Sequence, residues 1–303
     1  MNKVFVLAPN ESWIVDRLAK EWNEDNQDIS VSNPREADVV WLFAEWCWQS
    51  IAQSGLLTGK NVITTIHHIV PEKFGPHERM DFQLRDDVTT VYHVPNKYTE
   101  AFIRPLTSKP IHVIPYWANQ KIWTQTGTKE ELRKKHGLPA NAYLIGSFQR
   151  DTEGKDLISP KLEKGPDLLA DAIIGFKEKG KDYFPVEVVL AGWRRQYIMK
   201  RLDDAKIKYH YFELPKQDVI NELYQTLDLY PVTARQEGGP QSLVECGLLN
   251  VPCVSRDIGV AYQLLPPTAI SDDVTKAAPS VPNVEAFRLP DGYEPYRKLI
   301  ESL

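Results

Sequence analysis

The chain has 303 residues, which is enough for one large α/β domain or two of ordinary size, and we expect two. Its net charge of −5 gives no basic footprint for nucleic acid, and no window approaches the roughly 18 continuous apolar residues of a membrane-spanning helix. The three cysteines lack C-x-x-C spacing, and no signal peptide precedes the strand that begins at Lys3. We therefore expect a cytoplasmic protein in a reducing compartment, whose only membrane contact would be peripheral.

The first part of the chain alternates short apolar runs with segments of helical spacing. This alternation is typical of the αβ repeat of a parallel sheet. The apolar runs predict strands at 3–8, 37–43, 61–66, 88–94 and 111–116, and the helical spacing predicts a helix over 13–22, after a cap at Ser12, and another from 96.

Two of these predicted strands end in polar or aromatic residues. Ligands of open parallel sheets bind beyond the carboxyl ends of the strands, and Glu45 and His67 fall there. Trp46 and Trp48 beside Glu45 could stack on a sugar, although burial in the core or at a domain interface is the favoured interpretation. His67 and His68 make a poor metal pair, because adjacent strand residues point to opposite faces. We expect no metal and no other cofactor.

The second part of the chain repeats the pattern after a polar connector. We place the first domain at 1–121, the second at 122–290 and a last helical segment at 291–303. The second domain opens with a strand over 142–150 that delivers Arg150, and a polar insert leads to a helix that begins at Lys164. Later apolar runs predict strands at 186–192, 208–212, 227–232 and 251–255, with helices at 129–136, 217–226 and 294–300.

The stretch from Arg235 to Gly247 combines special backbone with a helix start. Gly238 and Gly239 can adopt backbone angles closed to other residues, and Pro240 suits the first position of a helix. The free amides of Gln241 and Ser242 would then point outward, as in the anion sites found at helix N-termini. The sequence therefore predicts a phosphate site at this turn.

Two carboxylates flank the predicted phosphate site, Glu237 just before the helix and Glu245 in its second turn. Carboxylates make poor phosphate ligands but good acceptors for adjacent hydroxyl groups of a sugar or a ribose. A phosphate beside two polyols describes a sugar nucleotide. The alternative is that Glu237 is a loop carboxylate and Glu245 a solvated helix residue.

Glu-Gly-Gly-Pro, then Ser-Leu-Val-Glu and a strand with Val-Pro-Cys-Val, resembles the paired-glutamate signature (E, seven residues, E) of retaining GT-B glycosyltransferases, the group 1 or family 4-like enzymes. The resemblance implies two Rossmann-like α/β domains facing a cleft, with the last helix packing back toward the first domain. It also implies that Glu237 contacts the transferred sugar and Glu245 the ribose of the donor.

Further residues match this family one by one. The resemblance implies that Arg150 and Lys164 grip the donor diphosphate, where two cations would offset the charge that grows on the leaving oxygen. It implies that the nucleobase lies against the backbone near Leu214 and that Gly259 lies near the donor sugar. Val-Ile-Thr-Thr-Ile-His resembles the strand of the first domain that ends in a functional histidine, here His67. Taken without the resemblance, Arg150 and Lys164 read as solvated surface cations.

The first predicted strand-to-helix junction, Ala8 to Ser12, departs from the family because it contains no glycine. Asn10 and Ser12 remain candidates for lining an acceptor site. The expected function is a retaining, metal-independent hexosyltransferase that moves a sugar from a nucleoside-diphosphate donor to a hydroxyl of a glycan, lipid or polysaccharide precursor. Two alternatives stay open: a non-catalytic module that binds a sugar nucleotide, and a two-domain receptor for small ligands.

Overall fold

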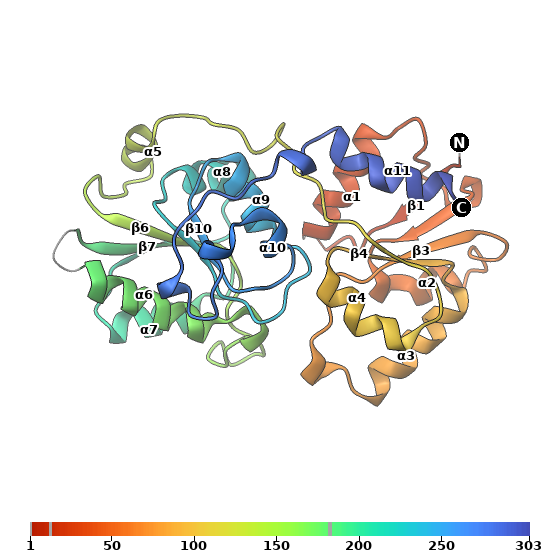
Figure 1. Cartoon of the computed structure of the whole chain (residues 1–303), viewed down its shortest axis with the longest axis horizontal. Helices are drawn as coiled ribbons and strands as arrows, with labels where there is room; N and C mark the ends of the chain where they lie inside the picture. The colour runs from red at the N-terminus through yellow and green to blue at the C-terminus, as the bar shows by residue number, and fades with distance from the viewer. Residues whose placement is uncertain (1, 12–13, 181–183) are drawn as a thin grey trace. The chain divides into compact units, whose positions relative to one another are not determined.

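The computed structural model describes residues 2–11, 14–180 and 184–303, so the predicted helix start at Ser12 and Trp13 lies outside the described residues. The chain divides into two compact units, each an α/β unit built on parallel strands (Figure 1). Unit 1 comprises Met1–Tyr116 and Pro290–Leu303, and unit 2 comprises Trp117–Leu289. The sequence places the boundary after residue 121. In the described ranges, every helix falls short of the length and hydropathy that crossing a bilayer requires.

Unit 1 is organised around a five-stranded parallel sheet in which β1 to β5 are neighbours in chain order. The strands are β1 (Val4–Leu7), β2 (Val39–Leu42), β3 (Asn61–Thr65), β4 (Val91–Val94) and β5 (Ile111–Val113). All four residues of β2 and of β4 are buried, as expected for strands covered by helices on both faces. Val4 also pairs in parallel with Ser30 at the other edge of β1.

The helices of unit 1 follow the strands. They are α1 (Ile14–Asp25), α2 (Trp48–Ala52), α3 (Pro76–Val88), α4 (Lys97–Ile103) and α11 (Glu294–Glu301). The start of α4 illustrates how sequence sets these bounds, because the Asn96 side chain accepts hydrogen bonds from the backbone of Tyr98 and Thr99.

The last helix, α11, belongs to unit 1 and lies beside α1 (Figure 1). The Tyr296 hydroxyl donates to the Pro115 carbonyl oxygen at 3.0 Å, and Asn2 Nδ2 donates to the Ile300 carbonyl oxygen at 3.0 Å. Trp22 of α1 packs edge-on against Trp41 of β2, with ring centroids 5.2 Å apart. These contacts join the two ends of the chain in one core.

Unit 2 contains a parallel group β6-β7-β8 and a parallel pair β9-β10. The strands are β6 (Tyr143–Ser147), β7 (Val186–Ala191), β8 (Tyr209–Phe212), β9 (Tyr230–Val232) and β10 (Cys253–Ser255). Gly146 N donates to the Leu229 carbonyl oxygen at 2.9 Å, which joins β6 to the segment entering β9. The spatial order is therefore β8-β7-β6-β9-β10, and the chain changes direction across the sheet between β6 and β9. Ligands of doubly wound sheets bind at such a switch point.

The helices of unit 2 lie between these strands in the sequence. They are α5 (Lys129–Lys135), α6 (Pro166–Gly180), α7 (Gln196–Asp204), α8 (Gln217–Gln225), α9 (Gln241–Leu248) and α10 (Ala261–Leu264). The turn that the sequence singles out, Arg235 to Pro240, connects β9 to α9 and so lies at the switch point.

Candidate functional site

Hydrogen bonds to backbone carbonyl oxygens hold three segments together at the switch point of unit 2. Gln149 Nε2, just after β6, donates to the Lys164 carbonyl oxygen at 2.9 Å. The Glu163 carbonyl oxygen accepts from Arg235 N at 2.8 Å and from Gln236 N at 3.1 Å. The regions that carry Arg150, Lys164 and Glu237 are therefore neighbours, although they are far apart in the sequence.

Lys164 ends a short 3₁₀ turn, Leu162–Lys164, and does not begin a helix as predicted. Gly165 follows in the left-handed region with φ 62°, and α6 begins at Pro166, whose fixed φ suits a first helical position. A Cβ at Gly165 would lie 2.1 Å from the Thr233 carbonyl oxygen. Glycine is therefore required here both for its backbone angles and for the close approach of the strand end.

Lys164 and Glu237 form an ion pair, with 2.6 Å between Lys164 Nζ and Glu237 Oε1. Their side chains are 23% and 16% exposed, so the pair is reachable but mostly shielded from solvent. An ammonium group has three donors and a carboxylate has two acceptor oxygens. One bond between them leaves donors on Lys164 for an anion and an oxygen on Glu237 for a hydroxyl.

A buried arginine fixes the strand ends from which Arg150 projects. Arg195 is fully buried, and its Nε lies 2.8 Å from Asp151 Oδ2. Its other nitrogens donate to the Ala191 carbonyl oxygen and to Ser147 Oγ, both at 2.8 Å. Burial raises the pKa of Asp151, and the charge of Arg195 opposes that rise. We read this pair as structural, because it leaves neither charge accessible.

Arg150 is positioned beside an exposed tryptophan. Arg150 Nε donates to the Thr152 carbonyl oxygen at 2.7 Å, and its guanidinium carbon lies 5.7 Å from the centroid of the Trp193 ring. Arg194 lies 4.5 Å from the same ring. Within the described ranges, the two terminal nitrogens of Arg150 donate to no other residue. They are therefore available to a phosphate.

The start of α9 differs in detail from the prediction. Pro240 precedes the helix as its N-cap, and α9 begins at Gln241. Neither Gly238 nor Gly239 has a positive φ; Gly259, on the loop after β10, has φ 51°. A Cβ at Gly259 would lie 2.9 Å from the Gly238 carbonyl oxygen. The permissive glycine that this turn needs is thus on the neighbouring loop.

Several polar groups at the start of α9 have no hydrogen-bond partner among the described residues. The backbone N–H groups of Gln241 and Ser242 donate to no residue in the described part of the chain. Gln241 Nε2 is buried and has no hydrogen-bond partner there either. These donors, next to the Lys164–Glu237 pair, make an electropositive site suited to an anion.

Glu245 is buried, with only 7% of its surface exposed, so the interpretation as a solvated helix residue is wrong. Its Oε2 accepts a hydrogen bond of 2.8 Å from the Tyr224 hydroxyl. Burial and the neighbouring Glu245 carboxylate raise the pKa of Tyr224, which keeps the hydroxyl protonated as a donor. Phe148 packs on Tyr224, with ring centroids 4.6 Å apart, and its N donates to the Tyr230 hydroxyl. No pattern in the sequence indicates that Tyr224 supports Glu245.

Leu214 follows β8 in an unusual conformation. Its φ is 44°, which is rare for a residue other than glycine, and 68% of its surface is exposed. Its backbone N–H and carbonyl groups bond to no described residue. An exposed apolar side chain beside open backbone groups is a suitable surface for a flat, hydrogen-bonding ring.

In unit 1, both ring nitrogens of His67 are occupied. His67 Nε2 lies 2.7 Å from the Phe43 carbonyl oxygen, which can only accept, so Nε2 carries the hydrogen. Nδ1 therefore accepts from the Tyr116 hydroxyl. Burial lowers the pKa of His67 to about 4, and the ring is neutral near pH 7. The sequence singled out His67 but not Phe43 or Tyr116, which fix its tautomer.

Glu45 lies next to His67, with 3.8 Å between Glu45 Oε2 and His67 Nε2. This oxygen is buried and has no hydrogen-bond partner in the described part of the chain. Burial raises the pKa of Glu45 to about 7. Of the neighbouring tryptophans, Trp48 is buried as the core interpretation predicts, whereas Trp46 is 44% exposed. Across the described residues, no three His, Cys, Asp or Glu side chains gather closely enough to hold a metal ion.

No family model matches the chain, and no curated protein matches it in sequence. Solved structures do resemble it. Anabaena HepE, in complex with UDP and glucose, superposes with a TM-score of 0.79 at 13% identity, and 100% of each chain is covered. Sucrose-phosphate synthase from Thermosynechococcus elongatus gives a TM-score of 0.63 at 14% identity, covering 98% of this chain and 81% of the synthase. WaaG, a glycosyltransferase involved in lipopolysaccharide biosynthesis, gives a TM-score of 0.60 at 13% identity, covering 86% of this chain and 82% of WaaG.

These likenesses extend over nearly the whole chain, so they concern both units. The chain has the fold of these proteins, the GT-B fold, which is built from two Rossmann-like α/β domains. The fold class predicted from the sequence is confirmed.

Proposed function

We propose that the protein is a glycosyltransferase that transfers a sugar from a nucleoside-diphosphate donor to a hydroxyl acceptor with retention of anomeric configuration. The observation that carries the proposal is the Lys164–Glu237 ion pair beside the unpartnered amides of α9 and the buried Glu245. It offers separate places for a phosphate and for two polyols. The likeness to HepE, whose structures contain UDP or UDP-glucose, supports the same assignment.

In this proposal the diphosphate lies against Arg150, Lys164, Gln241 and Ser242. Glu245, oriented by Tyr224, accepts from the ribose hydroxyls, and Glu237 accepts from the transferred sugar near Gly238 and Gly239. The nucleobase lies along the open backbone of Leu214. The acceptor is a hydroxyl of a glycan or a lipid-linked precursor.

The proposed reaction is a displacement on one face of the sugar. The bond from the anomeric carbon to the diphosphate oxygen breaks, the bond to the acceptor oxygen forms on the same face, and the acceptor proton passes to the leaving phosphate oxygen. Arg150 and Lys164 stabilise the charge that develops on the diphosphate, and this role needs no metal. His67, neutral and with both nitrogens bonded, serves to position the sugar and not to take a proton.

The direct test is NMR of the first product formed from an α-linked sugar nucleotide with a suitable acceptor. An α-glycoside supports retention, and a β-glycoside contradicts it. His67→Ala should lower turnover without changing the product's configuration. Activity that EDTA abolishes and Mn²⁺ or Mg²⁺ restores would contradict the metal-independent mechanism.

A further inference from the structure

The chain passes between the two units twice, and a buried tyrosine lies close in sequence to each of these points. Tyr116 is the last residue of unit 1 before the first crossing, and Tyr296, on α11, follows the return to unit 1 at Pro290. The two tyrosines are only 5% and 1% exposed. Both therefore belong to the core of unit 1, near the positions where the rest of the chain is attached to it.

The Tyr296 hydroxyl holds the backbone just before Tyr116. It lies 3.0 Å from the Pro115 carbonyl oxygen and 3.2 Å from the Ile114 carbonyl oxygen, so its single hydrogen is shared between two acceptors. The peptide bond after Pro115 is planar, and fixing its carbonyl group also fixes the direction in which the chain enters Tyr116. Helix α11 thus acts on the residue whose hydroxyl donates to His67 Nδ1.

A buried histidine holds the same backbone. His93 Nε2 lies 2.8 Å from the Ile114 carbonyl oxygen and so carries the hydrogen, while His93 Nδ1 accepts from Thr65 Oγ1 at 2.9 Å. Thr65 Oγ1 accepts in turn from Trp41 Nε1 at 2.8 Å. The Tyr296 ring packs on the His93 ring, with centroids 5.1 Å apart. These contacts leave one arrangement of hydrogens for the segment that Tyr296 holds.

Two hydrogen bonds hold the His67 ring, and Tyr116 makes one of them. His67 Nε2 donates to the Phe43 carbonyl oxygen at 2.7 Å, and Nδ1 accepts from the Tyr116 hydroxyl. A bond at one nitrogen lets an imidazole ring swing about that nitrogen, whereas bonds at both nitrogens fix its orientation and its tautomer. A displacement of the Tyr116 hydroxyl would therefore displace His67 as well.

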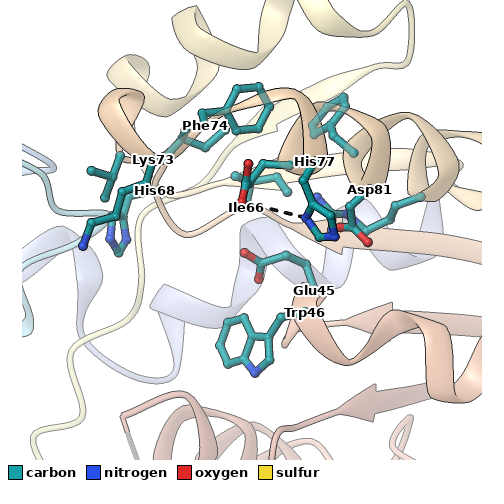
Figure 2. Close-up of a pocket in the computed structure, with 13 residues that line it drawn as sticks. Glu45, Trp46, Ile66, His68, Lys73, Phe74, His77 and Asp81 are labelled. Atoms are coloured by element: carbon teal, nitrogen blue, oxygen red, sulfur yellow. Dashed lines mark hydrogen bonds and ion pairs between the residues drawn. The ribbon is translucent and has the colours of Figure 1, made fainter. Parts of the chain in front are cut away.

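His67 lies beside a pocket of unit 1. Its chain neighbours Ile66 and His68 line this pocket of about 390 Å³ together with Glu45 and Trp46 (Figure 2). Glu45 Oε2 is 3.8 Å from His67 Nε2. A displaced His67 ring would therefore alter the wall of the pocket that carries Glu45.

We propose that Tyr296 is a positioning residue for His67, and that α11 acts through Pro115 and Tyr116 to hold the histidine ring in place. The inference rests on the proposed function, in which His67 positions the transferred sugar. It goes beyond that function because it gives the last helix of the chain a part in turnover. Small displacements of positioning groups lower turnover even when they begin far from the reacting atoms.

The test follows His67 in the full chain by ¹⁵N NMR near pH 7, with the ring signals assigned from His67→Gln. Burial lowers the pKa of His67 to about 4, so at this pH the ring is neutral. The Nδ1 signal then reports the hydrogen bond from Tyr116 and not a change of protonation. UDP release from UDP-glucose, UDP binding and the free energy of unfolding are measured on the same samples.

The variants are Tyr116→Phe, Tyr296→Phe, the double variant and the matched control Tyr293→Phe. Tyr293 lies three residues before Tyr296, and both rings pack on Trp22 of α1, with centroids 5.3 and 6.1 Å away. The Tyr293 hydroxyl donates to Asp25 Oδ2 at 3.4 Å and not to the backbone before Tyr116. The control therefore removes a similar hydroxyl from the same core without touching the proposed route to His67.

We expect Tyr116→Phe to move the His67 Nδ1 signal downfield, because this nitrogen loses its donor. Tyr296→Phe should move the signal in the same direction by less, and the double variant no further than Tyr116→Phe, because Tyr296 acts through Tyr116. Turnover should fall about three- to tenfold in Tyr116→Phe and about two- to threefold in Tyr296→Phe, as for a lost or weakened neutral hydrogen bond. Tyr293→Phe should change neither the signal nor the turnover.

The inference is wrong if Tyr296→Phe lowers stability as Tyr293→Phe does and leaves the His67 signal in place. It is also wrong if the double variant moves the signal further than Tyr116→Phe, or if the signal moves without a loss of turnover. If the parent binds UDP in any of these cases, only the positioning role fails. If the signal moves as expected but the parent binds no nucleoside diphosphate, the proposed function fails, and the part of α11 in turnover fails with it.

Discussion

The titratable residues near the strand ends differ in charge between the two units. In unit 2, Lys164 and Glu237 form a partly exposed ion pair beside the unpartnered amides of α9. In unit 1, burial lowers the pKa of His67 to about 4 and raises that of Glu45 to about 7. The unit 2 residues form a charged pair, whereas burial favours the neutral forms of both His67 and Glu45 in unit 1.

The proposed glycosyl transfer would have one charged and one neutral substrate, and such a pair would call for this difference. A diphosphate is highly charged and needs fixed cations, whereas a hydroxyl acceptor is neutral and needs oriented hydrogen-bond partners in a shielded pocket. Each of the following variants changes residues in one region, so the properties of the unchanged region serve as the reference.

The largest effect is expected from Lys164→Ala. Loss of one donor aimed at developing charge typically lowers turnover by about 10²–10³-fold, and the effect on donor affinity should be smaller. Lys155→Ala, in the neighbouring insert and exposed, is the control and should change neither value. Steady-state kinetics over a range of donor concentrations give the turnover number at saturation and the KM for the donor separately. A Lys164→Ala enzyme with parental turnover would remove Lys164 from the mechanism.

The free energy of unfolding should depend on pH through the Glu45 carboxyl, by about 3 kcal/mol. Its pKa rises from 4.5 to about 7 on folding, so the native state keeps a proton that the unfolded chain has released between these values. The stability that this proton linkage contributes is present below pH 4.5 and is lost as the pH rises through 7. Glu45→Gln has no such loss. Its unfolding free energy relative to the parent should therefore increase by about 3 kcal/mol from pH 4 to pH 8 in denaturant titrations.

His67 contributes in the opposite direction, because its pKa falls from 6.5 to about 4. Because the unfolded chain takes up a proton at His67 first, the protein becomes less stable as the pH falls from 6.5 to 4. This effect is the same in the parent and in the Glu45→Gln variant. A pH-independent difference between Glu45→Gln and the parent would show that Glu45 is solvated and ordinary in the native state.

Glu245→Gln tests the ribose assignment. The amide can still accept from Tyr224 but the side chain loses its charge. The affinity for a nucleoside diphosphate, with UDP as the probe, should therefore fall by about 1.5–3 kcal/mol, the usual contribution of a charge-assisted hydrogen bond. Pyrophosphate affinity should not change, because pyrophosphate has no ribose. Equal losses for UDP and pyrophosphate would place Glu245 against the phosphates instead.

The smallest effect is expected from Tyr224→Phe, which removes the hydroxyl that orients Glu245 and keeps the ring against Phe148. We expect a loss of about 0.5–1.5 kcal/mol in UDP affinity, as for a neutral hydrogen bond. In a double-mutant cycle with Glu245→Gln, the two losses should not add. Full additivity would mean that Tyr224 acts independently of Glu245.

Much of unit 2 could be predicted because its information is local. The turn, the helix start and both glutamates lie within Arg235–Gly247, and the β9, α9 and β10 elements all lie close to the ranges expected from the apolar pattern. The details of unit 2 that were predicted wrongly depend on tertiary contacts. Gly165 in the left-handed region, packed against Thr233, separates Lys164 from α6, and the glycine with a positive φ beside the turn is Gly259.

The surroundings of His67 in unit 1 could not be predicted from sequence. The partners of His67 come from Phe43 and Tyr116, on different strands' ends, and no spacing rule links them. Helix α3 of the same unit was not predicted because Phe82 and Arg85 are its buried residues, while Met80 and Leu84 are exposed. Such a helix has no continuous apolar face to detect.

The most direct test of the account is calorimetric titration of the full chain, in EDTA, with a panel of nucleoside diphosphates and their sugar conjugates. We expect at least one nucleoside diphosphate to bind at a single site per chain, more tightly than pyrophosphate, and we expect Glu245→Gln to remove most of that difference in affinity. Binding of no nucleotide, or of pyrophosphate as tightly as every nucleoside diphosphate, would contradict a donor site at the turn between β9 and α9.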